Sequence, residues 1–185
     1  MRSTASPFRR SLACLAAVTT GLAACAIDAP TASDARGATF ARTTGSAVQR
    51  PFSGHCETTF NPPPFPLPAV HRQIDVGTCQ LAHLGRAALH GVQDISFATG
   101  TQSGERTFTA ANGDELRAVH SGTSRPGQPG QVEFSATLTF VGGTGRFANA
   151  TGEARASGTA TLATRSASAT FDGWIAYDAS DRRRR

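Results

Sequence analysis

The residues with the most recognisable chemistry lie in the glycine-rich stretch TFVGGTGRFANATGEA, at positions 139–154. Residues 143–148 match G-x-G-x-x-G/A, a pattern whose glycines let a helix N-terminus approach a pyrophosphate. That motif requires a strand before it, a helix after it and an acid about 20 residues further on. Here an alternating strand pattern follows Gly152, and no Gly-Lys-Ser/Thr of a P-loop is present. The stretch therefore predicts a turn between two strands and not a nucleotide site.

We expect the residues of this turn to have structural roles. Its glycines tolerate positive φ angles and close backbone approach. We expect Phe147 to cover one end of an apolar interior. We expect Arg146 to pair with a carboxylate such as Asp114 or Glu115, or to lie in solvent.

The remaining acids and histidines show no catalytic or metal-binding spacing. The five histidines form no H-x-x-x-H pattern, and neither a nucleophile–base pair nor paired acids can be assembled. We therefore predict no catalytic residue, no metal site and no cofactor. Isolated polar residues on strand patterns are more often surface residues than acids or bases, and we read seven residues in this way: Glu57, Asp75, Asp94, Glu105, His83, His90 and His120.

The elements that hold these residues have a period of two from Val70 onward. In QVEFSATLTFV, residues 131–141, one face carries Val132, Phe134, Ala136, Leu138 and Phe140, and the other face is polar. Residues 153–163 and 166–177 repeat this pattern, and Asn112-Gly113-Asp114 predicts a tight hairpin turn between two further strands. A first short strand is expected at 55–60. It is followed by NPPPFPLP, residues 61–68, which forbids a helix and favours a stiff loop.

The chain therefore predicts an all-β domain of about eight antiparallel strands joined by short turns. The apolar faces alternate small residues with a few large ones, which is how a tapering closed barrel fills its interior. Closure also removes exposed sheet edges. A two-sheet sandwich is the alternative, although it favours more Val, Ile and Leu on both inner faces. The barrel is the preferred fold class, as a single antiparallel β-barrel over residues 51–178.

The N-terminus reads as an export signal. Three arginines precede a 13-residue apolar run, Leu12 to Ala24, which is shorter than the roughly 20 residues that span a membrane. Leu22-Ala-Ala-Cys25 resembles the bacterial lipoprotein signal, which implies that Cys25 is lipidated and becomes the new N-terminus. An ordinary signal peptide, cut within Ala24-Cys25-Ala26, is the alternative. The predicted parts are a signal at 1–24, lipidated Cys25 with a flexible tether at 25–50, and a basic tail at 179–185.

The four cysteines separate cleanly. Cys14 lies in the signal and Cys25 is the lipid acceptor, which leaves Cys56 and Cys79 in the exported domain. One remaining pair in an oxidising compartment favours a disulfide. In the loop-entropy model, a ring of this size stabilises the fold by about 3 kcal/mol. A metal site that uses both cysteines with histidines is the less favoured reading.

The charge excludes one class of partner. The formal net charge is +5, but three arginines leave with the signal and four more lie in the tail, Arg182 to Arg185. Residues 50–181 carry 9 arginines and 11 acids. A weakly acidic domain with no interleaved basic and aromatic residues is not expected to bind nucleic acid.

The hairpin ANGDEL (111–116), the glycine-rich turn GGTGRFANATGEA (142–154) and the terminal FDGWIAY (171–177) together resemble bacterial relatives of the allene oxide cyclase and dirigent barrels. The resemblance covers about residues 52–177 and implies an eight-stranded antiparallel barrel of calycin type. In the plant cyclases, the barrel cavity binds an unsaturated fatty-acid epoxide and guides ring closure. None of the cyclase's functional residues matches a position here, so the resemblance bears on the fold more than on an activity.

The expected protein is thus an exported, lipid-anchored small barrel of the bacterial cell envelope. It faces the periplasm or exterior, on the outer membrane if the cell has two membranes. We expect it to be non-catalytic and either to bind a small apolar ligand or to act as an interaction module. The alternative is an isomerase or cyclase that acts on a lipid-derived substrate in the barrel cavity. Its expected partners are the membrane, through the anchor, and that small ligand.

Overall fold

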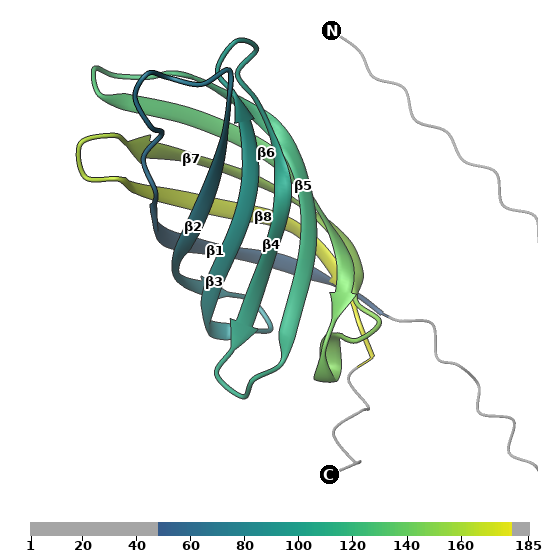
Figure 1. Ribbon diagram of the computed structural model, residues 1–185. Helices are drawn as coiled ribbons and strands as arrows, with labels where there is room; N and C mark the ends of the chain where they lie inside the picture. The colour runs from purple at the N-terminus through teal and green to yellow at the C-terminus, as the bar shows by residue number, and fades with distance from the viewer. Residues whose placement is uncertain (1–47, 179–185) are drawn as a thin grey trace, which may run out of the picture. The chain divides into compact units, whose positions relative to one another are not determined.

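The alternating segments form eight long antiparallel strands in the computed structural model, which describes residues 48–178 (Figure 1). The predictions for the signal, Cys25, most of the tether and the basic tail lie outside the described residues. Each strand pairs with the next along the chain, and the last pairs with the first, so the sheet closes into a barrel. The barrel prediction is confirmed and the sandwich is wrong. The strands are β1 Gln49–Phe60, β2 Val70–Leu81, β3 Gly85–Ser96, β4 Thr101–Ala110, β5 Glu115–Pro126, β6 Gln131–Gly143, β7 Thr151–Thr161 and β8 Ser166–Ala176.

The side-chain alternation agrees with the predicted inner face. In β6, Leu138 and Phe140 are fully buried inside the barrel, while Thr137 and Thr139 are exposed outside. One boundary was wrong: β1 begins at Gln49 and not at residue 55. Its early half pairs with β8 and places Phe52 in the core, a contribution that the short predicted strand missed.

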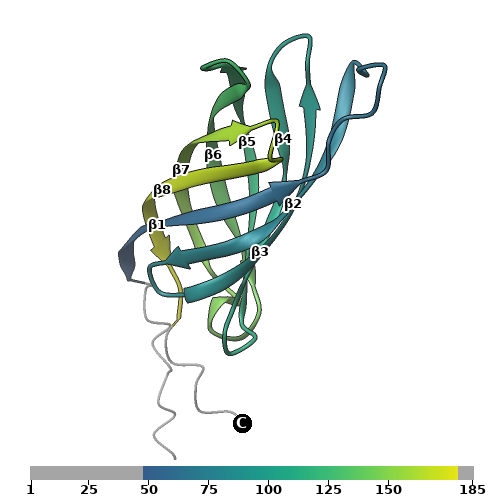
Figure 2. The same cartoon turned by 90° about the vertical axis from the view of Figure 1, so that its left-hand side faces the viewer.

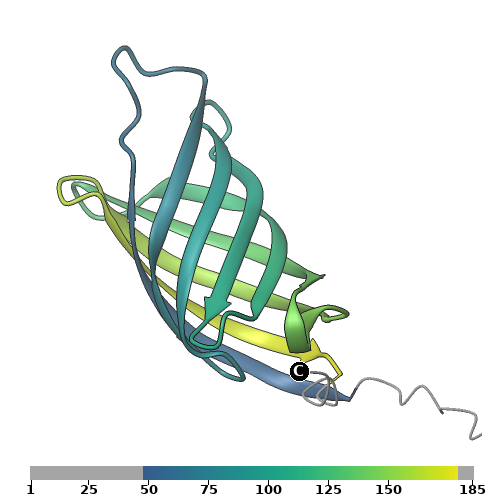
Figure 3. The ribbon, with the colours of Figure 1, turned by 60° about the horizontal axis from the view of Figure 1, so that its bottom comes forward.

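The strands bend around the barrel, as Figure 3 shows. Glycines on the inner face allow this curvature. A Cβ atom on Gly77 would meet the carbonyl oxygen of Glu57, and one on Gly104 would meet that of Val92. In both cases the obstructing atom belongs to the backbone of the neighbouring strand. These positions therefore need glycine because the strands approach closely where the sheet curves.

One end of the barrel is filled by aromatic side chains. The rings of Phe52 and Phe140 lie 4.8 Å apart between centroids, and those of Phe147 and Tyr177 lie 5.0 Å apart. Phe147 belongs to the short 3-10 helix η1, Gly145–Phe147, which interrupts the glycine-rich turn between β6 and β7. Its side chain has no exposed surface, so the expected cover of the apolar interior is confirmed. We call this the closed end.

The predicted ion pair of Arg146 is also confirmed, and it lies at the closed end. The Nε atom of Arg146 lies 3.6 Å from a carboxylate oxygen of Asp114, one of the two predicted partners. Asp114 follows Gly113, which has a φ of 85° in the tight connection between β4 and β5. Two turns that are distant in sequence therefore meet at this end of the barrel.

The opposite end carries the stiff loop 61–69 and the connections β3–β4, β5–β6 and β7–β8. Figure 2 shows the first three of these connections projecting beyond the rest of the barrel, away from the point where β1 begins. We call this the open end.

A disulfide joins Cys56 of β1 to Cys79 of β2, as predicted. The two residues are directly opposite in the strand register, and both side chains are buried inside the barrel. The covalent link closes the segment that contains the proline-rich loop at its base.

Candidate functional site

The interior of the barrel is hollow toward the open end. A cavity of about 280 Å³ lies between the aromatic core and the connections of the open end. The space remains open because the inward-facing residues of β7 and β8 at this end are small, namely Ala160, Ala167 and Ala169. At the closed end the corresponding volume is filled by large side chains. The other apolar walls come from residues on eight different elements and loops: Phe60, Pro63, Ile95, Phe97, Pro126, Val132, Phe134, Leu162 and Phe171.

Charged and amide side chains line part of the cavity and meet in one cluster. Asp75 of β2 and Arg106 of β4 both point inward, and a guanidinium nitrogen lies 3.3 Å from a carboxylate oxygen of Asp75. Gln73 donates a hydrogen bond of 2.7 Å to one carboxylate oxygen, and Gln93 donates one of 3.0 Å to the other. The carboxylate is therefore held on both oxygens, as a buried charge requires.

His120 of β5 belongs to the same cluster through its contact with Gln93. The Oε1 atom of Gln93 lies 3.0 Å from Nε2 of His120 and also accepts a hydrogen bond of 3.3 Å from Arg106. Because an amide oxygen can only accept, Nε2 of His120 must carry the proton in this arrangement. Its Nδ1 atom is buried and has no partner. The imidazole is thus neutral and packed inside the barrel.

Burial dominates the electrostatics of the cluster. It raises the pKa of Asp75 above its ordinary value, although Arg106 and the hydrogen bond from Gln73 act in the opposite direction. Burial likewise lowers the pKa of Arg106 against the attraction of Asp75. The pKa of His120 falls to about 4, first because of burial and second because of the positive charge of Arg106. The cluster thus combines one compensated ion pair with one neutral imidazole.

One amide in the cavity wall has an unused donor. Gln102 of β4 is only 5% exposed, and its Nε2 atom is buried without a hydrogen-bond partner. A buried donor left unpaired costs about 1–3 kcal/mol. His71 of β2 is also 5% exposed, and its Nε2 atom lies 3.3 Å from the carbonyl oxygen of Asn61. Gln102 lines the cavity, so rotation of its amide toward the hollow would present this unused donor to a bound molecule.

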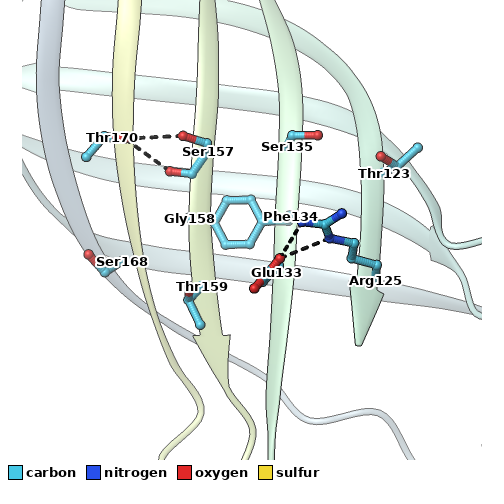
Figure 4. A pocket seen from close by; sticks show the side chains of 10 residues that line it. All are labelled: Thr123, Arg125, Glu133, Phe134, Ser135, Ser157, Gly158, Thr159, Ser168 and Thr170. Atoms are coloured by element: carbon cyan, nitrogen blue, oxygen red, sulfur yellow. Dashed lines mark hydrogen bonds and ion pairs between the residues drawn. The ribbon is translucent and has the colours of Figure 1, made fainter. Parts of the chain in front are cut away.

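A second hollow lies on the outer face of β5 to β8, where Ser, Thr and an ion pair line a groove of about 610 Å³ (Figure 4). Arg125 donates two hydrogen bonds, of 2.9 and 2.7 Å, to one carboxylate oxygen of Glu133. Ser157 and Thr170 hydrogen bond to each other across the two neighbouring strands. Most of these side chains are exposed, and four of them already bond to one another in pairs. The inner cavity is therefore the better candidate site.

The structure corrects two of the seven surface assignments. Asp75 and His120 are 4% and 5% exposed and lie together in the polar cluster, so the prediction that they are surface residues was wrong. Glu57, Asp94, Glu105 and His90 are exposed on the outer face. His83 is partly buried at the closed end, where its Nε2 lies 2.9 Å from the carbonyl oxygen of Pro51.

Sequence reasoning also passed over the other members of the cluster. Gln73, Gln93, Gln102, Arg106 and His71 were not singled out, since amides and arginines are common on strands. A signal was present in the alternation of β2: Cys79 and Leu81 point inward, and counting back by twos reaches His71, Gln73 and Asp75. In β5, Leu116 and Ala118 fix the inward position of His120 in the same way.

Two further observations bear on other site classes. Within residues 48–178, no group of three or more metal-ligating side chains lies close enough together to hold a metal ion. In the same range, no helix has the length and apolar character needed to cross a membrane.

Comparison with known proteins gives little beyond the fold. No family model and no curated protein matches the chain. Among solved structures, the pterocarpan synthase dirigent protein PsPTS1 aligns with a TM-score of 0.49 and 13% identity, over 72% of this chain and 97% of that one. The pterocarpan synthase dirigent protein GePTS1 aligns with a TM-score of 0.45 and 15% identity, over 70% and 86% of the two chains. At these values the likeness does not extend to site residues or to an activity.

Proposed function

We propose that this barrel binds a small amphipathic molecule in the cavity at its open end. The observation that carries the proposal is a cavity of about 280 Å³ whose mostly apolar wall includes a few convergent polar side chains, among them Gln102 with its unpaired Nε2. An apolar pocket with a few convergent polar groups is the usual design of a small-molecule site. A ligand carbonyl, hydroxyl or ether oxygen would accept the hydrogen bond that Gln102 leaves unmade, once the amide of Gln102 rotates toward the cavity.

The cavity also limits the size and charge of the ligand. Its volume of about 280 Å³ lies just below the usual range for ligand pockets, about 300–1,000 Å³. The charge of Arg106 is already offset by Asp75, so a neutral polar group fits this wall better than a second carboxylate. We infer a compact apolar molecule with one neutral oxygen-bearing end.

Filling the cavity should abolish binding without unfolding the barrel. Ala167→Phe places a ring in the hollow, whereas Ala88→Phe makes the same change on the exposed outer face of β3 and serves as the matched control. We expect mass spectrometry of organic extracts of the purified full chain to detect a copurifying small molecule with the parent protein and with Ala88→Phe. The molecule should be absent with Ala167→Phe. An empty parent protein, or retention by Ala167→Phe with a native circular dichroism spectrum, would contradict the proposal.

An isomerase or cyclase in the same cavity is the second candidate, and the position of Asp75 favours it. A carboxyl group in a cavity wall with a raised pKa has the property expected of a general acid. Against this role, hydrogen bonds occupy both oxygens of Asp75. Chromatography distinguishes the candidates: an isomerase converts the copurifying molecule to a product of equal mass and loses this activity in Asp75→Asn, whereas a binding protein returns the molecule unchanged. We favour the binding protein.

We further propose that the barrel is exported and anchored by lipid at Cys25 in a bacterial cell envelope, facing the periplasm or the exterior. The supporting observations are the basic and apolar leader that ends in Leu22-Ala-Ala-Cys25 and a disulfide of the kind found in oxidising compartments. In a two-membrane cell, Ala26 after the cysteine favours the outer membrane.

Replacement of Cys25 tests the anchor. Cys25→Ser should abolish acylation, measured by incorporation of labelled palmitate, and should shift the protein from the membrane fraction to the soluble fraction. Cys14→Ser removes the other cysteine of the leader and should leave both readouts unchanged. Continued processing and membrane fractionation of Cys25→Ser would show that the lipid is not attached there.

A further inference from the structure

Large apolar side chains are exposed at the open end of the barrel, on three of its four connections and at the start of β2. Phe65 is 99% exposed and Leu67 is 58% exposed, both on the loop 61–69. Val70 begins β2, Phe97 lies between β3 and β4, and Leu162 lies between β7 and β8, and all three are exposed. We call these five residues the apolar rim. Exposed apolar residues scattered singly are ordinary, but a group around one opening marks an interaction surface.

Hydrogen bonds between the connections hold this rim in place. The backbone N–H of Phe97 donates to the carbonyl oxygen of Ala69 at 3.1 Å, and that of Phe60 donates to Arg165 at 3.0 Å. The N–H of Leu162 donates to Gly130 at 3.0 Å, which joins the β7–β8 connection to the β5–β6 connection. Phe97, Leu162 and the two ends of the loop 61–69 are therefore fixed by backbone hydrogen bonds.

The uncompensated charge beside the rim is positive. Arg72 pairs with Asp94 at 3.8 Å, and Arg125 pairs with Glu133 at 2.7 Å. Arg165, three residues after Leu162, is exposed, and no ion pair is found for it among residues 48–178. A basic side chain next to exposed apolar ones suits a surface of anionic headgroups over hydrocarbon.

We propose that the apolar rim docks on an anionic lipid bilayer, with the cavity opening toward the hydrocarbon. Phe97 and Leu162 belong both to the exposed rim and to the cavity wall, so the docked face and the binding space are continuous. An amphipathic ligand could then pass between membrane and cavity without crossing water. The docking goes beyond the proposed ligand binding and requires no bound ligand.

The chain length before the barrel permits this orientation even if Cys25 is the anchor. β1 begins at the end of the barrel opposite to the rim (Figure 2). A strand of 12 residues spans about 40 Å. The sequence between Cys25 and Gln49 has 23 residues, and a chain of that length reaches at most about 80 Å. The open end can therefore face the same membrane that holds the anchor.

Tryptophan fluorescence in vesicles tests the docking. In a Trp174→Phe background, which removes the only native tryptophan, one full-chain variant carries Phe65→Trp at the rim. The matched control carries Val48→Trp at the opposite end, another solvent-facing position, where Val48 is 64% exposed. Each variant is mixed with phosphatidylethanolamine and phosphatidylglycerol vesicles whose acyl chains are brominated. Interfacial side chains lie about 5–10 Å into the headgroup and acyl boundary, so we expect about twofold or greater quenching at position 65 and little at position 48.

Other outcomes identify other occupants. Equal quenching at both positions, or quenching at neither, would overturn the proposal. A blue shift of the tryptophan at position 65 that grows with protein concentration and needs no vesicles would make a second copy of the chain the occupant. If Phe65→Trp fails to fold, Leu67→Trp reports on the same loop. Arg165→Gln should weaken docking about fivefold on phosphatidylglycerol vesicles, because one basic residue near an anionic surface contributes about that factor.

Discussion

Arg106→Met is expected to lower the free energy of unfolding at neutral pH by about 3–5 kcal/mol, the usual cost of removing one partner of a buried ion pair. The carboxylate of Asp75 is 4% exposed and would be left inside the barrel with hydrogen bonds but without a cation. The matched control is Arg155→Met, which changes an exposed arginine on the outer face of β7. Denaturant unfolding at pH 7 measures both losses, and the control should change by less than about 0.5 kcal/mol.

A second substitution shows whether the uncompensated charge is the cause. Asp75→Asn keeps the shape of the side chain and removes its charge, so the double variant Arg106→Met, Asp75→Asn should be more stable than Arg106→Met alone. If the double variant is less stable than either single variant, packing and not charge explains the loss.

The pH dependence of Arg106→Met follows from the same ion pair. Burial already raises the pKa of Asp75, and removal of Arg106 takes away the attraction that opposes this rise. A carboxyl group whose pKa is higher in the folded state than in the unfolded state favours folding at low pH and loses that contribution as the pH rises through the folded value. Arg106→Met should therefore recover part of its lost stability relative to the parent protein when the pH is lowered.

The sequence predicted the barrel because a period of two is a local property. The alternation in β6 and β8 indicated which face is inward, and the structure places Leu138 and Phe171 there. The glycine-rich turn was also readable, since the following strand pattern excludes the helix that a phosphate site needs. The early part of β1 was missed because Arg50 and Pro51 interrupt the alternation that Phe52 continues.

The candidate site could not be predicted in the same way. Whether an inward Asp is tolerated depends on partners from other strands, and Asp75, Gln93 and Arg106 come together only when β2, β3 and β4 pair in register. The cavity is also a property of the closed sheet, because Ala167 and Ala169 leave a hollow only where no large residue from the opposite wall fills it. From local sequence alone, a polar residue on a strand is expected to be exposed. That expectation fails where several buried polar side chains form hydrogen bonds with one another.

Substitution of His120 is expected to have the second large effect. Its contribution to folding stability changes with pH in the direction opposite to that of Asp75. The pKa of His120 falls from 6.5 to about 4 in the folded protein, first by burial and then by the charge of Arg106. The imidazole of His120 is therefore protonated near pH 6.5 in the unfolded chain, but only near pH 4 in the folded barrel. A group with a depressed folded pKa stabilises the fold fully above its unfolded value and loses that contribution as the pH falls through the folded value.

Replacing His120 by glutamine should therefore reduce the acid sensitivity of the barrel. The charged and titratable neighbours of His120 in the cluster are Arg106 and Asp75, and both remain in His120→Gln, so the difference between the parent protein and the variant isolates the imidazole. Between pH 7 and pH 4.5 the parent should lose about 2 kcal/mol more unfolding free energy than the variant, because about two pH units of the shifted titration are crossed at 1.36 kcal/mol each. Urea unfolding at several pH values measures this difference. His90→Gln removes an exposed imidazole from β3 as the control. If it changes the pH slope as much as His120→Gln does, the burial of His120 is not what makes the barrel sensitive to acid.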